Sequence, residues 1–396
     1  MEYRFREEIV NAKKAAMGKM YNLAKQNLQP DQKIINFASG YPAEETFPRK
    51  KLNELFSRII SDRYDVQLLQ YSPHKGYEPL IQNIKKFLNY NRKLVRDEED
   101  IIITYGSTEG IFLSSFAFLS RGDRIIVEDP TYVNAIKIFQ ILGAEIVGVP
   151  MENDGLNLDI FETEIKKGAK LVYLIPNFNN PSGITTSLEK RKEILRLAYK
   201  YNVPIIEDDP YGYLRYRGVS VANIKELDDY GNVIYIGTMS KTIAPAMRIG
   251  YIVARKKVID KLTVLKAFHS NGVSYILQQV TAQLLEDDYV QKHIMSICKI
   301  YEEKLLQFEK NIVTYLPETI KYLKPDGGIF AWITFPENIN MYEMCRKSAI
   351  ELHVAMTPGS GFCVSNSDRC NSVRINFVKE SLANIEKGII EIASIL

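Results

Sequence analysis

Short runs of apolar residues recur through the middle of the chain and predict the strands of one sheet. The runs are rich in Ile and Val and do not alternate strictly with polar residues, which is typical of strands that helices cover on both faces. Amphipathic stretches such as residues 188–201 lie between several of them, and this alternation predicts a mostly parallel sheet wrapped by helices. The predicted strands comprise residues 101–104, 124–128, 144–149, 170–176, 203–208, 233–238 and 249–254.

A change in the hydrophobic pattern near residue 289 indicates a second domain. With 396 residues, the chain is also too long for one ordinary core. We predict a large domain of residues 49–288 and a smaller α+β domain formed by residues 1–48 and 289–396. The elements expected in the C-terminal part are a helix at 291–314, a strand at 327–335, a helix at 341–352, a strand at 372–377 and a final helix.

Composition and charge narrow the class of protein. Hydrophobic residues make up 46% and charged residues 25%, as in ordinary globular proteins. The 51 basic and 48 acidic residues give a formal net charge of +3, which gives no reason to expect a nucleic-acid or membrane partner. The charged start lacks the apolar core of a signal peptide, and no apolar run approaches the ~18 residues of a membrane span. We therefore expect a cytoplasmic protein, and the scattered cysteines and histidines predict no metal site.

The polar residues that follow the predicted strands are candidates for a binding site, because ligands of an open parallel sheet bind beyond the carboxyl ends of its strands. After the first strand, a glycine-flanked turn opens a helical stretch at Ser107 and Thr108, where free N–H groups suit a phosphate. Tyr132 follows the next strand and can stack on a flat heterocycle. Taken singly, Ser107 or Thr108 is more often an ordinary helix N-cap, and Tyr132 is more often a half-exposed residue of a plain turn.

Three further strands are followed by an amide, a carboxylate and a lysine. Asn180 lies in a turn, and Asp208 ends its strand, where a carboxylate near a core is costly unless it is paired. Lys241 follows another strand, with Arg248 seven residues later. A lysine is ordinarily solvated, but here it can form a Schiff base, and the arginine can hold a phosphate as a fork of donors. Together with the phosphate-binding turn and the aromatic ring, these groups are the parts that hold pyridoxal 5′-phosphate (PLP).

Over nearly its whole length the chain resembles the class I and II aminotransferases, which are PLP enzymes of fold type I. It looks closest to the branch that contains aminoadipate and kynurenine aminotransferases and the aminotransferase-like half of MocR-type regulators. The resemblance implies an α/β fold, with a mostly parallel seven-stranded sheet in the large domain and a smaller α+β domain. The motifs that carry it, in the family's order, are YSPHKGYEPL, GSTEG, EDPTY, PNFNNPSG, EDDPYGYLRY, SKTIAPAMRIGY and PGSGF.

The resemblance also implies a role for each residue around the cofactor ring. Lys241 would be the Schiff-base lysine, and Asp208 would face the pyridine nitrogen. Asn180 and Tyr211 would hold the ring oxygen, and Tyr132 would stack on the ring. Of these, Lys241, Asp208 and Tyr211 would be the catalytic residues.

The remaining roles concern the phosphate, the substrate and a partner subunit. Arg374 would bind the substrate α-carboxylate, and Gly40 and Asn180 would line the same place. Tyr71 would reach into the site of a second subunit, so the resemblance implies a homodimer. The residues implied to bind the phosphate are Ser107, Thr108, Thr238, Ser240 and Arg248. Thr-Glu in GSTEG, Ser182 and Thr238 depart from the commonest family pattern but keep its hydrogen-bonding or turn chemistry.

The predicted activity is a ping-pong transamination, in which an L-amino acid gives its amino group to a 2-oxo acid. Another PLP reaction, such as that of a β-lyase or a decarboxylase, is an alternative on the same scaffold. A second alternative is the ligand-sensing module of a MocR-type regulator. That alternative requires an upstream winged-helix domain, and the 36 residues before FASGYP are too few for it. No second arginine clearly marks a site for a dicarboxylate, so the sequence does not predict the side-chain specificity.

Overall fold

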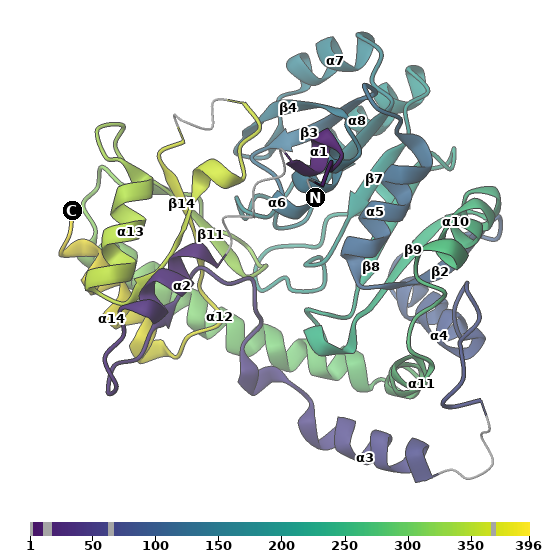
Figure 1. Cartoon of the computed structure of the whole chain (residues 1–396), viewed down its shortest axis with the longest axis horizontal. Coiled ribbons are helices and arrows are strands. Elements are labelled where there is room, and N and C mark those ends of the chain that lie inside the picture. Colours follow the sequence, from purple (N-terminus) through teal and green to yellow (C-terminus); the bar gives the residue numbers. More distant parts are fainter. Residues whose placement is uncertain (1–2, 11–17, 62–66, 366–369) are drawn as a thin grey trace.

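The computed structural model describes residues 3–10, 18–61, 67–365 and 370–396. In Figure 1, the middle of the chain forms one body, and the C-terminal elements form a second body beside it. Helix α12 (Tyr289–Tyr315) runs along both bodies, and α2 (Lys19–Gln26) of the N-terminal segment packs against the second one. Within the described ranges, no helix has both the length and the apolar character that crossing a bilayer requires.

The main sheet contains the seven predicted strands and one more. In spatial order they are β2 (Glu99–Tyr105), β9 (Ile249–Arg255), β8 (Val233–Thr238), β7 (Ile205–Asp208), β6 (Leu171–Leu174), β3 (Arg124–Asp129), β4 (Glu145–Glu152) and β5 (Gly155–Leu156). Strands β8, β7, β6, β3 and β4 pair in parallel, whereas β9 pairs antiparallel with both β8 and β2. The additional strand, β5, pairs antiparallel with β4 at the sheet edge. Its two residues are too few to carry a hydrophobic pattern.

Helices cover both faces of this sheet, and the strands therefore show no polar alternation. The helices of this body are α3 (Arg49–Ser61), α4 (Glu78–Asn89), α5 (Ser107–Phe118), α6 (Val133–Ile141), α7 (Leu158–Lys166), α8 (Leu188–Lys200), α9 (Ile224–Leu227), α10 (Lys256–His269) and α11 (Tyr275–Leu284), and the short N-terminal helix α1 (Glu7–Val10) packs against α6. On β2, Ile101 and Ile103 pack in one hydrophobic cluster with α4 and α11, whereas Ile102 packs in another with α5 and α10. The covered sheet confirms the predicted α/β class.

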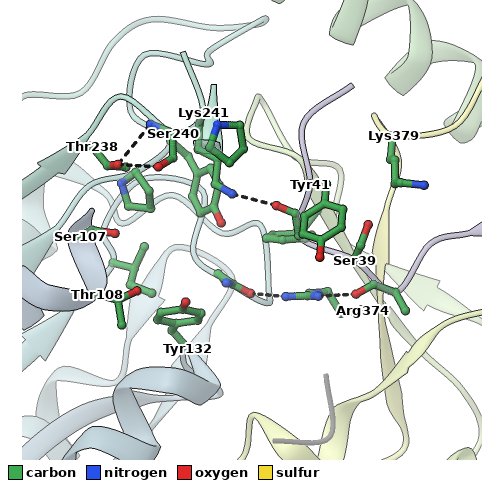
Figure 2. Close-up of a pocket in the computed structure, with 18 of the residues that line it drawn as sticks. Ser39, Tyr41, Ser107, Thr108, Tyr132, Thr238, Ser240, Lys241, Arg374 and Lys379 are labelled. Carbon is green, nitrogen blue, oxygen red and sulfur yellow. Dashed lines mark hydrogen bonds between the residues drawn. The ribbon is translucent and has the colours of Figure 1, made fainter. Parts of the chain in front are cut away.

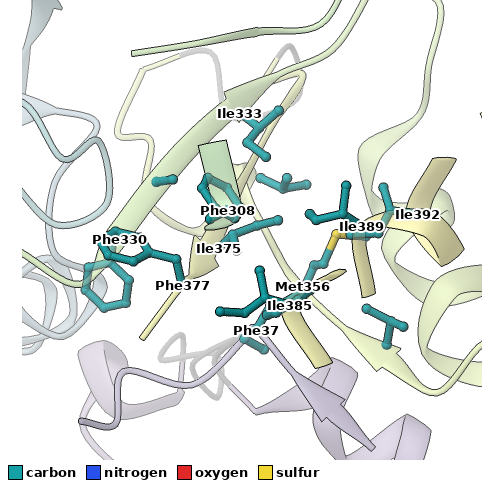
Figure 3. Packing of buried hydrophobic residues seen from close by; sticks show 14 of the residues in the cluster. Phe37, Phe308, Phe330, Ile333, Met356, Ile375, Phe377, Ile385, Ile389 and Ile392 are labelled. Atoms are coloured by element: carbon teal, nitrogen blue, oxygen red, sulfur yellow. The ribbon is translucent and has the colours of Figure 1, made fainter. Parts of the chain in front are cut away.

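A separate hydrophobic cluster joins the N-terminal segment to the C-terminal part of the chain. Its strands are β1 (Ile35–Asn36), β10 (Lys321–Tyr322), β11 (Phe330–Thr334), β12 (Val354–Ala355), β13 (Thr357–Pro358) and β14 (Ser372–Asn376), and its helices besides α2 and α12 are α13 (Met341–Glu351) and α14 (Leu382–Ala393). Phe37 shares this cluster with Phe308, Ile375 and Ile389 (Figure 3). The shared core favours the predicted small domain, although the boundaries of both domains stay a prediction.

Candidate active site

A cavity of about 680 Å³ lies where the carboxyl ends of the main strands face β14 and the N-terminal segment. Most of the predicted site residues follow strands of the main sheet, and the structure brings these residues together with Gly40 and Arg374. Tyr71 is the exception, because it does not line the cavity. The predicted residues that line it are Gly40, Ser107, Thr108, Tyr132, Asn180, Asp208, Tyr211, Thr238, Ser240, Lys241, Arg248 and Arg374.

Lys241 follows β8 and extends its amine into the cavity (Figure 2). Its Nζ donates a hydrogen bond to the carbonyl oxygen of Gly40 at 2.8 Å and lies 6.0 Å from the centre of the Tyr211 ring. Burial and, to a smaller extent, the positive charges of Arg374 and Arg248 together lower the pKa of Lys241 to about 8, against the opposing charge of Asp208. A lysine with such a pKa is partly neutral near physiological pH and can act as a nucleophile.

Asp208 ends β7 and is 2% exposed. Its Oδ2 accepts a hydrogen bond from the Tyr173 hydroxyl at 2.8 Å, whereas its buried Oδ1 has no hydrogen-bond partner among the described residues. Burial raises the pKa of Asp208 to about 7, and the bond from Tyr173 opposes this rise. Because leaving a buried carboxylate oxygen unpaired is costly, the cavity is suited to a ligand that donates a proton or a hydrogen bond there.

The anion-binding end of the cavity is built from β8, β9 and the start of α5. Thr238 Oγ1 lies 3.0 Å from Ser240 Oγ, as drawn in Figure 2. Arg248 adopts a left-handed φ of 51° and donates from Nη2 to the Tyr105 carbonyl at 2.9 Å. Gly106, with φ of 77°, precedes α5, and a Cβ there would collide with the Arg248 guanidinium. A guanidinium, two hydroxyls and the free N–H groups of a helix start are a suitable environment for a phosphate.

The opposite end of the cavity is built around Arg374 of β14, which is 1% exposed. Its Nη1 donates to Asn180 Oδ1 at 3.0 Å and its Nη2 to the Ala38 carbonyl at 2.7 Å. The guanidinium carbon lies 4.1 Å from the centre of the Phe330 ring and 4.9 Å from that of Phe362. Burial lowers the pKa of Arg374 to about 10, so the group stays charged at neutral pH and can bind a carboxylate.

Two tyrosines border the space between these ends. Tyr132 accepts a hydrogen bond from Asn134 Nδ2 at 2.9 Å, and the Tyr211 ring meets the Phe330 ring edge to face at 5.8 Å. Burial raises the pKa of both phenols. Both hydroxyls therefore remain protonated at neutral pH and can donate hydrogen bonds to a ligand.

Several lining residues were not identified from the sequence. Ser39, Tyr41 and Lys379 lie at the Arg374 end of the cavity (Figure 2). Their closeness in sequence to predicted site residues could have identified them, because Ser39 and Tyr41 flank Gly40 and Lys379 lies five residues beyond Arg374. Within the described ranges, no group of His, Cys, Asp or Glu side chains is arranged to hold a metal ion.

Comparison with known proteins identifies the family. The family model "Aminotransferase class I and II" matches residues 32–390, and the chain therefore belongs to the class I and II aminotransferases. It is 36% identical to aromatic-amino-acid aminotransferase 1 of Thermococcus litoralis, over 91% of this chain and 87% of that protein. It is 30% identical to 2-aminoadipate transaminase of Thermus thermophilus, over 90% of this chain and 88% of that protein.

Solved structures lead to the same family. The crystal structure of Pyrococcus horikoshii kynurenine aminotransferase, determined with PMP, matches with a TM-score of 0.92 and 32% identity over 98% of this chain and 96% of that one. The protein is thus an enzyme of PLP fold type I that transfers amino groups and uses PLP as its cofactor. The residues present fit this cofactor, because the cavity combines a nucleophilic lysine, an unpaired carboxylate oxygen and an anion cradle.

Proposed function

We propose that Lys241 and Asp208 are the catalytic centre of this aminotransferase. When bound, PLP supplies an electron sink that stabilises negative charge at the substrate Cα. Lys241 would hold the cofactor by its amine, with loss of water, and once a substrate amine displaces it the freed amine would move the proton of the substrate Cα. Asp208 keeps the ring nitrogen protonated through its Oδ1, and the unpaired state of that buried oxygen is the observation that carries the proposal.

The other lining residues orient the cofactor. Asn180 and Tyr211 hold the ring oxygen, and Tyr132 stacks on the ring. The hydroxyls and guanidinium of the anion cradle bind the phosphate, which fixes the ring between the two ends of the cavity. The residues assigned to the phosphate are Ser107, Thr108, Thr238, Ser240 and Arg248.

Arg374 binds the α-carboxylate of the amino acid and of the 2-oxo acid, which take turns in the same place. Its guanidinium is fixed by Asn180 Oδ1 and by the Ala38 carbonyl, so it meets a carboxylate as a rigid fork. The Lys241 amine bonds the Gly40 carbonyl at the same place. A substrate held there has its Cα close to the Lys241 amine, as proton transfer requires.

Lys379 is a cation of this cavity without an assigned role, and we propose that it receives a second carboxylate on the substrate side chain. Its Nζ lies 3.4 Å from Glu380 Oε1, an oxygen that also accepts the Asn36 N–H at 3.0 Å. A side-chain carboxylate can therefore compete for Lys379. Glu44 lines the same cavity and could instead attract a positively charged substrate side chain. A preference for basic substrates is therefore the competing prediction.

A panel of amino donors with 2-oxoglutarate as acceptor tests the reaction and the substrate class. Transamination predicts one glutamate for each donor consumed. With the donor alone, the reaction should stop after one equivalent, when the cofactor has taken up the amino group. Release of pyruvate and ammonia would indicate a β-lyase, and release of carbon dioxide a decarboxylase. If basic donors outperform acidic ones, the role given to Lys379 is wrong.

We propose that the protein is a homodimer in which Tyr71 completes the site of the second subunit. We also propose that it is located in the cytoplasm. Tyr71 is 83% exposed in the single chain, and Leu69, two residues before it in the sequence, is 86% exposed. Large apolar side chains exposed at two such close positions favour a protein interface. Mixing Tyr71→Ala with Lys241→Ala subunits would restore up to about a quarter of wild-type activity, because random mixed dimers retain one intact site. No restoration would contradict this assignment.

A further inference from the structure

Two consecutive carboxylates at the end of β7 each accept a hydrogen bond from a buried tyrosine. Tyr173 of β6 donates to Asp208 Oδ2 at 2.8 Å, and Tyr235 of β8 donates to Asp209 Oδ2 at 3.0 Å. Because adjacent residues of a strand point to opposite faces, the two pairs lie on opposite faces of the sheet. The register agrees, since Tyr173 pairs with Ile206 and therefore shares the face of Asp208.

The two carboxylates differ in their other partners. Asp209 also accepts hydrogen bonds from Asn177 at 3.0 Å, from Asn223 at 2.9 Å and from the Gly212 N–H at 2.9 Å. Asp208 lines the cavity, and its Oδ1 has no partner among the described residues. The hydroxyl of Tyr173 is therefore far more important for the orientation of Asp208 than the hydroxyl of Tyr235 is for Asp209.

The ring and the hydroxyl of Tyr173 have separate functions. The ring is fully buried in the sheet core and meets the Phe139 ring edge to face at 5.5 Å. The hydroxyl bonds Asp208 and does not line the cavity. Phenylalanine would keep the packing and remove the bond, so the two functions can be tested apart.

We propose that Tyr173 is a positioning residue that fixes the Asp208 carboxylate with Oδ1 available to the cofactor ring nitrogen and keeps it anionic. The inference rests on the role proposed above for Asp208. Since a hydroxyl donor stabilises the charged form of a carboxylate, Tyr173→Phe raises the pKa of Asp208 above its value of about 7. The proton between Asp208 Oδ1 and the ring nitrogen would then reside more on Asp208 and less on the nitrogen.

The test compares Tyr173→Phe with the matched control Tyr235→Phe in the holoenzyme. Nitrogen NMR of isotope-labelled cofactor should show partial loss of ring-nitrogen protonation in Tyr173→Phe and the wild-type signal in Tyr235→Phe. We expect kcat to fall about tenfold, the equivalent of one pKa unit, with KM unchanged. The kinetic isotope effect of a Cα-deuterated donor should increase, because Cα proton removal becomes slower. Thermal unfolding of both variants reports whether either change acts through stability alone.

Asp208→Asn separates failure of this inference from failure of the proposed function. If Asp208→Asn leaves the nitrogen signal and kcat unchanged, the role of Asp208 itself is wrong. If Asp208→Asn alters both but Tyr173→Phe behaves like Tyr235→Phe, the positioning role alone is wrong. Combining Tyr173→Phe with Asp208→Asn should add less than twofold to the loss in kcat, because both changes act on the same bond; full additivity would contradict the inference.

Discussion

The two ends of the cavity are built in different ways. At the cofactor end, Asp208, Thr238 and Lys241 stand at or just after the carboxyl ends of neighbouring parallel strands. At the substrate end, Arg374 lies on β14, which pairs antiparallel with β11 and β13 in a sheet separate from the main one, and it bonds the Ala38 carbonyl, 336 residues away in sequence. One end thus follows from the topology of a single sheet, and the other depends on how distant segments pack.

The two ends also treat charge differently. Burial lowers the pKa of Lys241 to about 8, so its amine can lose its proton under mild conditions. Arg374 keeps a pKa of about 10 in spite of its burial and remains a fixed positive charge. The cofactor end therefore contains a group whose proton moves, and the substrate end contains a permanent anchor.

Removing the reactive amine is the most damaging change at the cofactor end. Lys241→Ala should lower kcat by about 10³-fold or more, since both the nucleophile and the proton carrier are lost. Its apoprotein should still bind PLP through the anion cradle, without the visible absorbance that a lysine-bound cofactor gives. Absorbance spectra and donor turnover measure both effects. Wild-type colour and activity in this variant would exclude Lys241 as the cofactor lysine.

At the substrate end, Arg374→Lys keeps the positive charge and removes the fork of donors. We expect kcat/KM to fall about 10²-fold for every donor, as is typical when one partner of a buried charged interaction is lost. The absorbance of the bound cofactor should be unchanged, because the variant keeps a positive charge beside Lys241 and leaves the anion cradle intact. Loss of cofactor from this variant would show that Arg374 is also needed for cofactor binding, and the division between a cofactor end and a substrate end would be wrong.

The pH dependence of cofactor uptake tests whether the pKa of the Lys241 amine is lowered. The protonated amine is not a nucleophile, so the rate of PLP uptake by apoprotein should rise about tenfold per pH unit below the lysine pKa and level off above it. The plateau should begin near pH 8, whereas an unperturbed lysine would show the rise continuing beyond pH 10. Stopped-flow absorbance at a series of pH values measures the profile.

The smallest effect is expected at Lys379. Lys379→Gln should raise the KM for 2-oxoglutarate about tenfold and leave the KM for pyruvate unchanged, because pyruvate has no second carboxylate. The matched control is Lys387→Gln, which removes the same charge from an exposed position outside the cavity. Equal effects on both acceptors would contradict a role in side-chain recognition.

The same division explains what the sequence could predict. The seven main strands carry continuous apolar runs, and Asp208 and Lys241 were found because they follow such runs. Arg374 and Gly40 were identified through the family resemblance, since no local pattern connects β14 with the N-terminal segment. Lys379 was not identified at all, because its position in the cavity depends on tertiary packing.

Borohydride reduction of the holoenzyme followed by peptide mass spectrometry tests the central claim most directly. Reduction makes the bond between lysine and cofactor permanent, so the cofactor mass marks the lysine that held it. We predict the added mass on the peptide that contains Lys241, at full occupancy. Added mass on a different lysine, or none on any peptide of an active enzyme, would contradict the account.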